Sequence, residues 1–358
     1  MKIFPCQVCA QTVYFDNVRC NGCGHTLGFA TEAMTLLALE PAGGDLWQAV
    51  EEPARRYRLC RNSVRHEVCN WLVAEDEGET LCRACRLNRT IPDLGIAGNV
   101  RLWGRLEAEK RRLVYSLLRL GLPVPSKRED PQAGLAFDFL ADPDPQFREG
   151  PGVTIGHAGG VITLNIAEAD DAVRERMRQQ MAEPYRTILG HFRHESGHYY
   201  WDRLVRNGPW LDACRERFGD DRQDYAAALQ RHYQGGPPAD WPSRFVSAYA
   251  SSHPWEDWAE SWAHYLHLVD TLETAWQFGL GIHPRSDPDG QLSAEADFDP
   301  YACPDFDDLL ASWLPLTYAL NSLNRSMGRP DLYPFVLAPP AVEKLRLVHA
   351  IVGEAAKS

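Results

Sequence analysis

The sequence predicts an α+β protein in which a small, cysteine-rich, metal-stapled region precedes a mostly helical domain with a short β-sheet. Three observations lead to this prediction. Eight of the ten cysteines fall within residues 6–85. Short apolar segments bounded by glycine and proline, which are typical of strands, follow between residues 135 and 166. Beyond residue 170, apolar side chains recur every three or four positions, which is the period of an amphipathic helix.

The chain is long enough for more than one domain, since it has 358 residues of which 44% are apolar. We expect three segments. Residues 1–95 form the cysteine-rich region, residues 96–134 a helix and a linker, and residues 135–358 the larger domain.

One long helix and a few strands are expected in the middle of the chain. Asn99 can cap a helix in which leucines recur at helical spacing up to Leu120, and Gly121 closes it. After a proline-containing linker, residues 135–140 are expected to form a strand. A second such linker precedes a hairpin over residues 153–166, with its turn at two adjacent glycines.

Six further helices are expected, and an acidic loop over residues 283–304 separates the fourth from the fifth. Their approximate ranges are 170–181, 184–208, 220–233, 254–279, 305–325 and 340–354. The helix that begins at Pro254 carries an apolar stripe that should face a core. This stripe consists of Trp258, Trp262, Tyr265, Leu266, Val269, Leu272 and Trp276.

The charge of the chain is acidic and uneven. The net charge is −12, with 19 basic and 20 acidic residues in 1–150 and 18 basic and 29 acidic residues in 151–358. Nucleic acids and anionic membranes both attract surplus lysine and arginine, so this balance argues against either as a partner. A cationic metal or a basic partner would suit the second half best.

The sequence shows neither a secretory signal nor a membrane span. No apolar segment follows Met1, and no uncharged apolar run of about 18 residues occurs in the chain. We therefore expect a cytoplasmic protein. In a reducing compartment, clustered cysteines are better explained as metal ligands than as disulfides.

The first four cysteines have the spacing of a zinc ribbon. Two Cys-x-x-Cys pairs ten residues apart can supply four thiolates at tetrahedral angles. The predicted ligands are Cys6, Cys9, Cys20 and Cys23. Ligand spacing alone does not separate zinc from iron in such a site.

The next four cysteines contain only one such pair, but we predict a second four-cysteine zinc site from them. The predicted ligands are Cys60, Cys69, Cys82 and Cys85. His25 or His66 could replace a misplaced cysteine, and the lone thiols Cys214 and Cys303 are expected to be buried. Both sites can staple a region that lacks a large core, or can recognise a partner protein.

Residues 194–198 have the sequence His-Glu-Ser-Gly-His within a predicted helix. The i,i+4 spacing places His194 and His198 on one face, where both can bind one zinc ion. Glu195 is rotated by about 100° and can reach a zinc-bound water without becoming a ligand. Zinc lowers the pKa of such a water, and a carboxylate can accept its proton while it attacks a carbonyl. Gly190 and Gly197 weaken the helix and suggest close backbone approach.

A catalytic zinc usually takes a third protein ligand. A metzincin would have a histidine six residues after His198, and Leu204 occupies that position. A glutamate on a later helix is the gluzincin alternative. We therefore assign Glu256 as the third ligand and Glu260, one turn later, as the acceptor of the outer N–H of one histidine. The other interpretation of these carboxylates is a solvated acidic face at a helix N-terminus.

Residues 249–260, Tyr-Ala-Ser-Ser-His-Pro-Trp-Glu-Asp-Trp-Ala-Glu, resemble the catalytic region of anthrax lethal factor and its relatives. In that family a tyrosine lies seven residues before the glutamate ligand, and Tyr249 matches it. The resemblance implies that the Tyr249 hydroxyl stabilises the oxyanion of the tetrahedral intermediate, which can contribute roughly 2–4 kcal/mol. By analogy with gluzincins, the strand over residues 161–166 is expected to be an edge strand that binds an extended substrate.

Three other histidines lie near this motif. His264 and His267 follow Glu260 by one and two turns, and we interpret them as hydrogen-bonded residues at the edge of the core rather than as ligands. His253 precedes the helix and could line the cleft.

Over nearly its full length the chain also resembles a bacterial family of zinc-binding metallopeptidases with an N-terminal zinc-ribbon domain. The resemblance depends on residues 60–71, 82–88, 190–195 and 253–265. It implies a zincin-like metallopeptidase domain, one catalytic and two structural zinc ions, and a protein or peptide substrate. The alternative function is a zinc-ribbon module that binds protein or nucleic acid and carries an inactive peptidase-like scaffold.

Overall fold

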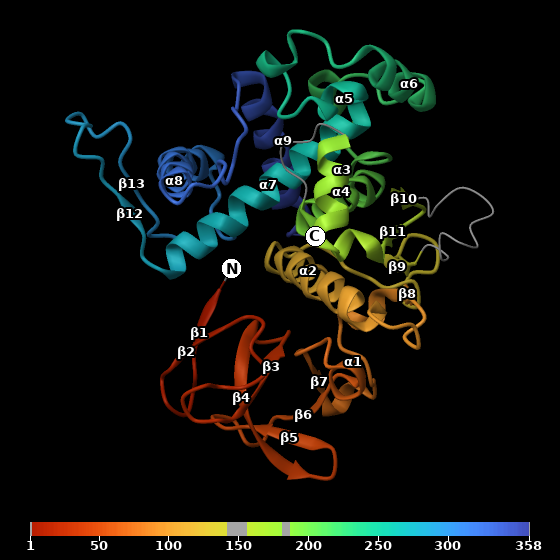
Figure 1. Ribbon diagram of the computed structural model, residues 1–358, viewed down its shortest axis with the longest axis vertical. Helices are drawn as coiled ribbons and strands as arrows, with labels where there is room; N and C mark the ends of the chain where they lie inside the picture. The colour runs from red at the N-terminus through yellow and green to blue at the C-terminus, as the bar shows by residue number, and fades with distance from the viewer. Residues whose placement is uncertain (1, 142–155, 181–186, 358) are drawn as a thin grey trace. The chain divides into compact units, whose positions relative to one another are not determined.

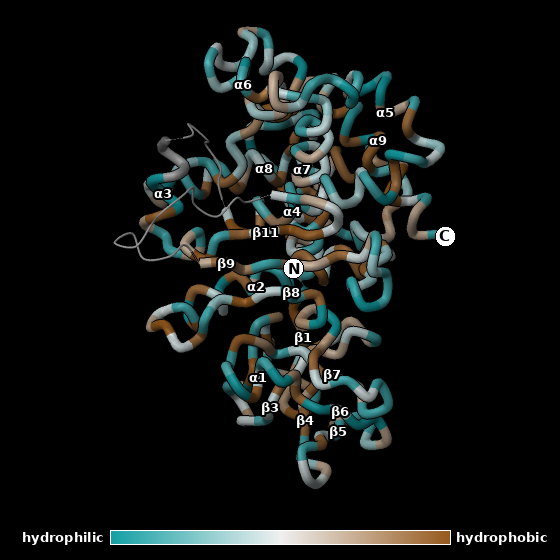
Figure 2. Tube along the Cα trace, turned by 90° about the vertical axis from the view of Figure 1, so that its right-hand side faces the viewer, coloured by the Kyte–Doolittle hydropathy of each residue, from teal (hydrophilic) through white to brown (hydrophobic). Residues whose placement is uncertain are grey.

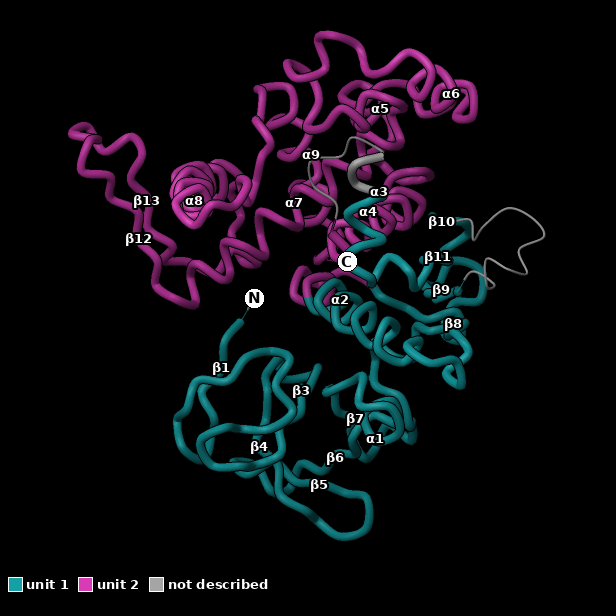
Figure 3. Tube along the Cα trace, in the orientation of Figure 1, with its two compact units in different colours: residues 1–115, 124–177 teal, residues 116–123, 178–358 magenta. Residues whose placement is uncertain are grey.

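The computed structural model describes residues 2–141, 156–180 and 187–357 (Figure 1). The chain forms two compact units (Figure 3). The first comprises Met1–Tyr115 and Val124–Met177, and the second comprises Ser116–Pro123 and Arg178–Ser358. The first unit holds most of the strands and the second is mainly helical, so the α+β prediction is confirmed. The segment boundaries predicted at residues 95 and 134 do not coincide with this division and stay a prediction.

The N-terminal part of the first unit contains more regular sheet than the sequence analysis expected. Strands β1 (Ile3–Pro5) and β2 (Thr12–Tyr14) pair antiparallel. An antiparallel meander follows, whose strands are β3 (Thr26–Ala30), β4 (Thr35–Gly43), β5 (Leu46–Ala49), β6 (Arg56–Leu59) and β7 (Leu72–Ala74). The side chains of Leu39, Ala49, Tyr57 and Leu72 form its buried core. This small core explains why the segment is a sheet rather than a set of loops.

The cysteine region also contains helix α1 (Arg61–His66) and the 3₁₀ turn Cys85–Leu87. Helix α2 (Asn99–Arg119) follows and confirms the long helix predicted there. Gly121 ends it with φ of +68°, as expected. Asn99 is not the cap that was predicted. It is already helical, and its side-chain amide donates to the carbonyl of Asp93, which fixes the preceding loop instead.

A four-stranded sheet completes the first unit in the order β10-β11-β9-β8. Its strands are β8 (Asn88–Thr90), β9 (Ala136–Leu140), β10 (Gly156–Ala158) and β11 (Val161–Asn165). The predicted strand and hairpin correspond to β9 and to β10–β11, although residues 153–155 of the hairpin lie outside the described residues. Apolar colouring marks β11 in Figure 2, in keeping with its burial. Helix α3 (Asp171–Gln180) follows the sheet.

The expectation that the strand at residues 161–166 is an edge strand is wrong. β11 pairs in parallel with β9 on one side and antiparallel with β10 on the other. Its backbone donors and acceptors are therefore already engaged, and it cannot add an extended peptide. Among the described strands of this sheet, β10 and β8 form the edges.

The second unit is built from helices joined by loops (Figure 1). The helices are α4 (Ile188–Tyr200), α5 (Leu211–Phe218), α6 (Tyr225–Gly235), α7 (Pro254–Gln277), α8 (Phe306–Ser326) and α9 (Pro339–Ala355). All but α5 were predicted. Two-residue strands β12 (Gly281–Ile282) and β13 (Ala294–Glu295) pair antiparallel, so β13 interrupts the acidic loop predicted over residues 283–304.

Two of the predicted helices have different boundaries in the structure. The start predicted at Pro184 for the helix over residues 184–208 lies outside the described residues, and α4 begins at Ile188 with Thr187 as its cap. The Thr187 hydroxyl accepts from the N–H of Gly190 at 2.9 Å. At the other end, α4 passes into a π-helical turn over Trp201–Val205. The helix α6 begins later than predicted because Asp224 caps it.

Helix α7 forms the core of the second unit. The predicted apolar stripe is buried, apart from the partly exposed Trp276. Buried carboxylates and histidines occupy other faces of the same helix, so α7 is covered on nearly every side. Buried polar side chains need hydrogen-bond or metal partners. A functional site in this unit is therefore expected where the carboxylates and histidines of α7 meet such partners.

Candidate metal centres

The helices α4 and α7 lie in close contact at Gly197. A Cβ atom there would lie 2.9 Å from the Cα of Ala259, so only glycine lets the two backbones approach this closely. The indole N–H of Trp258 donates to the Gly197 carbonyl at 2.8 Å, and that of Trp262 donates to the Ser196 hydroxyl at 3.0 Å. This contact holds the histidine motif of α4 against the glutamate motif of α7.

The structure brings the three predicted ligands His194, His198 and Glu256 together. The Nε2 atom of His194 lies 3.0 Å from Oε2 of Glu256, and the Nε2 atom of His198 lies 3.5 Å from the same oxygen. Two ligand atoms of a tetrahedral zinc ion would be separated by about 3.3 Å. The spacing therefore fits a zinc ion.

The protonation of His194 strengthens this interpretation. Its Nδ1 lies 2.7 Å from Oε1 of Glu260 and must donate, because a carboxylate accepts. In a neutral ring the Nε2 atom is then an acceptor, and it faces a second acceptor, the buried Glu256 oxygen, which receives no hydrogen bond. Two converging acceptors need either a proton or a metal cation between them. The chemistry of the donor set thus agrees with a metal site.

Glu260 has the position predicted for an orienting residue. Its second oxygen accepts from the hydroxyl of Ser247 at 2.5 Å, so both oxygens are engaged. Burial alone would raise the pKa of Glu260, but the hydrogen bond and charge of His194 lower it. A fixed, ionised Glu260 holds the His194 ring in one orientation.

Glu195 follows His194 and is 6% exposed. Its Oε1 atom lies 3.3 Å from Nε2 of His191, one turn earlier, whereas its buried Oε2 atom has no hydrogen-bond partner in the described structure. Burial opposes ionisation, but His191, His194 and His198 together lower the pKa of Glu195 to about 2. The carboxylate is thus ionised at neutral pH and retains one free acceptor atom.

Two phenols lie beside these groups. The Tyr249 ring is 5.9 Å from that of His194, and burial, together with the charge of Glu256, raises its pKa. Tyr225, at the start of α6, donates to Oε1 of Glu256 at 2.6 Å. Tyr225 could not be predicted as a site residue from the sequence, because it lies 31 residues before Glu256 and no motif connects them.

The remaining histidines of the region have structural roles. Nδ1 of His253 caps α7 by accepting from the N–H of Trp255 at 3.0 Å. His264 is buried and hydrogen-bonded to Tyr333 at 2.6 Å. His267 is hydrogen-bonded to Arg193 and also buried. The last two thus lie as predicted for hydrogen-bonded residues, and His253 serves α7 as its N-cap.

The first four cysteines converge in the first unit. The Sγ atoms of Cys6 and Cys23 are 3.6 Å apart, as are those of Cys9 and Cys20. A disulfide would need about 2.05 Å, whereas two thiolates on one tetrahedral zinc ion are about 3.8 Å apart. The geometry fits a metal ion and excludes a disulfide.

The second four cysteines form a fully buried cluster. Cys69 and Cys82 are 3.7 Å apart at Sγ, and Cys60 and Cys85 complete the group. His25 and His66 lie outside both clusters, so neither replaces a cysteine. Of the two lone thiols, Cys214 is buried as predicted, but Cys303 is only partly buried because it lies in a loop, with Sγ 3.2 Å from the carbonyl of Asp305.

Cationic side chains of α2 lie close to this second cluster. Burial lowers the pKa of Arg111, but Cys69, Glu107 and Cys85 raise it by a larger amount. Lys110 is fully buried and paired with Glu107 at 2.9 Å, and Glu107 contacts the Cys85 sulfur at 3.7 Å. Arg111 can therefore offset part of the negative charge of four thiolates bound to a divalent ion, whereas Lys110 and Glu107 neutralise each other.

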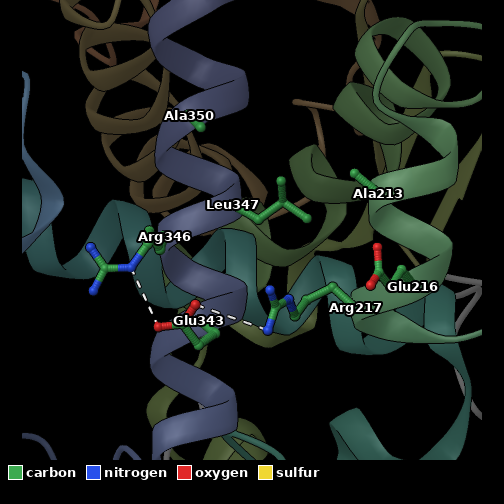
Figure 4. A pocket seen from close by; sticks show the side chains of 7 residues that line it. All are labelled: Ala213, Glu216, Arg217, Glu343, Arg346, Leu347 and Ala350. Atoms are coloured by element: carbon green, nitrogen blue, oxygen red, sulfur yellow. Dashed lines mark hydrogen bonds and ion pairs between the residues drawn. The ribbon is translucent and has the colours of Figure 1, made fainter.

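A shallow groove lies elsewhere in the second unit, between α5 and α9 (Figure 4). It is lined by Ala213, Glu216, Arg217, Glu343, Arg346, Leu347 and Ala350. The Glu343 carboxylate is paired with Arg217 at 3.9 Å and with Arg346 at 3.4 Å. The predicted site residues lie outside this groove. In the described part of the chain, no helix combines the length and apolarity needed to cross a bilayer.

Comparisons with known proteins match the chain in two consecutive parts, whose border does not coincide with that between the two compact units. Residues 3–96 match a zinc-ribbon domain family, and residues 99–351 match the family described as "Putative zinc-binding metallo-peptidase". Uncharacterized proteins of Mycobacterium bovis and of two strains of Mycobacterium tuberculosis are each 43% identical to the chain. These alignments cover 99% of this chain and 96% of each relative. No solved structure matches the chain significantly.

Proposed function

The chain belongs to the zinc-binding metallo-peptidase family with an N-terminal zinc-ribbon domain, and we propose that it is a zinc-dependent endopeptidase of the gluzincin type. The observation that carries the proposal is the convergence of Nε2 of His194 and Oε2 of Glu256 at 3.0 Å, with Nε2 of His198 at 3.5 Å from that oxygen. We assign one catalytic zinc to these three residues and one structural zinc to each cysteine cluster.

Each residue then has a distinct role. Zinc, when bound, supplies a Lewis acid that polarises a carbonyl and makes water acidic enough to lose a proton near neutral pH. Glu195 accepts the proton of the attacking water through its free Oε2 atom, and delivers it to the leaving amine. Tyr249 donates its hydroxyl hydrogen to the oxygen that becomes negative. Glu260 fixes the orientation of His194.

The proposed substrate is a protein or peptide, and the proposed location is the cytoplasm, where thiols stay reduced and can bind metal. The cysteine modules can additionally dock a partner protein. The net charge of −12 argues against nucleic acid in that role.

The test is the zinc content of the purified full chain, measured by mass spectrometry. We expect about three zinc ions in the wild type and about two in a His194→Ala/His198→Ala double variant. An unchanged count would show that these histidines hold no metal. The alternative, a zinc-ribbon binding protein with an inactive scaffold, would then replace the peptidase proposal.

A further inference from the structure

The two carboxylate oxygens of Glu256 have different surroundings. Oε2 faces the histidine nitrogens and receives no hydrogen bond. Oε1 accepts the hydroxyl hydrogen of Tyr225 at 2.6 Å. Glu256 is only 1% exposed, so the phenol occupies the place that water would take beside a surface carboxylate.

The position of Tyr225 is fixed by the first turn of α7. Since Nδ1 of His253 accepts from the N–H of Trp255, its Nε2 carries the proton and donates to the carbonyl of Gln223 at 3.2 Å. The Tyr225 ring packs edge-on against the rings of His253 and Trp255, at 5.2 and 5.6 Å between centroids. The start of α6 is thus tied to the same turn that carries Glu256.

The Trp255 ring also contacts a ligand. It lies 4.0 Å from the ring of His198, centroid to centroid. The Tyr225 ring thus packs on Trp255, and Trp255 packs on His198. A shift of Tyr225 would therefore disturb two of the three proposed ligands, His198 and Glu256.

We propose that Tyr225 is a positioning residue of the metal centre, whose hydroxyl holds the outer oxygen of Glu256 so that only Oε2 is presented to the cation. This inference rests on the proposed catalytic metal site and adds a residue to it. Without the phenol, the carboxylate can rotate and a buried acceptor loses its partner. Partners of this kind typically change metal affinity 10–100-fold.

The role differs from that of Tyr249. The Tyr225 hydroxyl donates its hydrogen to Oε1 of Glu256 at 2.6 Å. Because that proton is engaged by Glu256, Tyr225 is not available to a reacting carbonyl. Tyr249→Phe should lower kcat with unchanged zinc affinity, whereas Tyr225→Phe should lower zinc affinity.

The experiment compares Tyr225→Phe with Tyr233→Phe, a matched control on the same helix whose side chain is 62% exposed. Zinc affinity of each site is measured on the full chain by chelator competition, and the cobalt-substituted protein is examined by visible absorption. We expect a 10–100-fold weaker histidine–glutamate site and an altered cobalt spectrum in Tyr225→Phe only. Both cysteine sites should keep wild-type affinity and serve as internal controls.

Each other outcome has a defined meaning. Wild-type affinity and spectrum in Tyr225→Phe would overturn the inference and leave the proposed function intact. Equal losses at the cysteine sites would show general destabilisation and also overturn it. Only two zinc ions in the wild type would instead refute the catalytic metal site itself.

Discussion

The cysteine clusters of the first unit and the histidine–glutamate cluster of the second differ in the number of ligands and in their surroundings. Four sulfurs fill a tetrahedron, so the cysteine clusters leave no position for a substrate. Three ligands leave a fourth direction open in the second unit. There, Glu195 keeps a buried oxygen without a hydrogen bond. Ligand number alone separates sites built for stability from a site that can carry out a reaction.

The charged side chains near the second cysteine cluster also differ from those near the histidine–glutamate cluster. Arg111 lies near the second cysteine cluster and can offset part of the thiolate charge, while Lys110 is paired with Glu107. Glu195 and Glu260 lie beside the histidine cluster, where neighbouring histidines lower the pKa of both carboxyls. A cationic side chain thus offsets part of the negative charge at the second cysteine cluster, whereas the carboxylates of the histidine cluster favour a bound cation.

The largest expected effect is on folding of the first unit. Cys82→Ser removes a fully buried ligand, and loss of a structural metal should cost about 4–5 kcal/mol or more. The region around residues 60–85 should become protease-sensitive and lose amide-exchange protection. The matched control is Cys303→Ser, a partly buried thiol outside both clusters, which should behave as wild type. Full protection in Cys82→Ser would contradict a structural zinc there.

Glu195→Gln tests whether the histidine–glutamate cluster supports peptide hydrolysis. The amide cannot accept a proton, so peptide hydrolysis should fall about 10²–10⁴-fold while zinc content stays at three. Hydrolysis of a protein substrate and zinc content are measured on the same preparation. Glu216→Gln, an exposed residue of the α5–α9 groove, should leave both unchanged. Hydrolysis by Glu195→Gln at the wild-type rate would eliminate Glu195 as the base.

Gly197→Ala tests how much the close contact between α4 and α7, which brings the histidine and glutamate motifs together, contributes to stability. The new Cβ would meet the Ala259 backbone at 2.9 Å, which cannot move like a side chain, so unfolding free energy should fall by about 1–2 kcal/mol. Gly235→Ala, with open space around its Cβ position, should instead be neutral or slightly stabilising. Denaturant unfolding of both variants decides between these signs.

The smallest expected effect is on the stability of the first unit at acidic pH, and it does not involve the cysteine clusters. Burial would raise the pKa of Asp138, but hydrogen bonds from Arg89 and Thr90 lower it. A lowered folded-state pKa stabilises the protein above the unfolded value of about 3.9, and this stabilisation disappears as the pH falls through the folded value. Because Arg89 is about half exposed, we expect at most about 1 kcal/mol.

The measurement for this pair is the difference in unfolding free energy between wild type and Asp138→Asn from pH 7 to pH 3. The difference should be constant near neutrality and shrink below pH 4. A difference that grows as the pH falls would reverse the assigned sign.

Most of the helices, the histidine pair and the Cys-x-x-Cys pairs could be predicted from the sequence because their signals are local. Glu256 was assigned instead from the pattern of a later helix. The helix α5 was missed since it is short, with only eight residues. The five-stranded meander was underestimated because its strands are short and a small core stabilises them together. Asn99 was assigned as a cap from its residue type, but the chain turns earlier and uses its amide to hold a loop.

Spacing along the chain by itself determined which pairs of nearby side chains can share a metal ion. A helix of fixed pitch brings residues 194 and 198 to one face, and a tight turn brings the two cysteines of each Cys-x-x-Cys pair together, whatever surrounds them. Only the tertiary structure decided that β11 lies inside its sheet and that Tyr225 contacts Glu256. Contacts of this kind join segments far apart in the chain. They follow from how whole helices and strands pack, and no local periodicity encodes that packing.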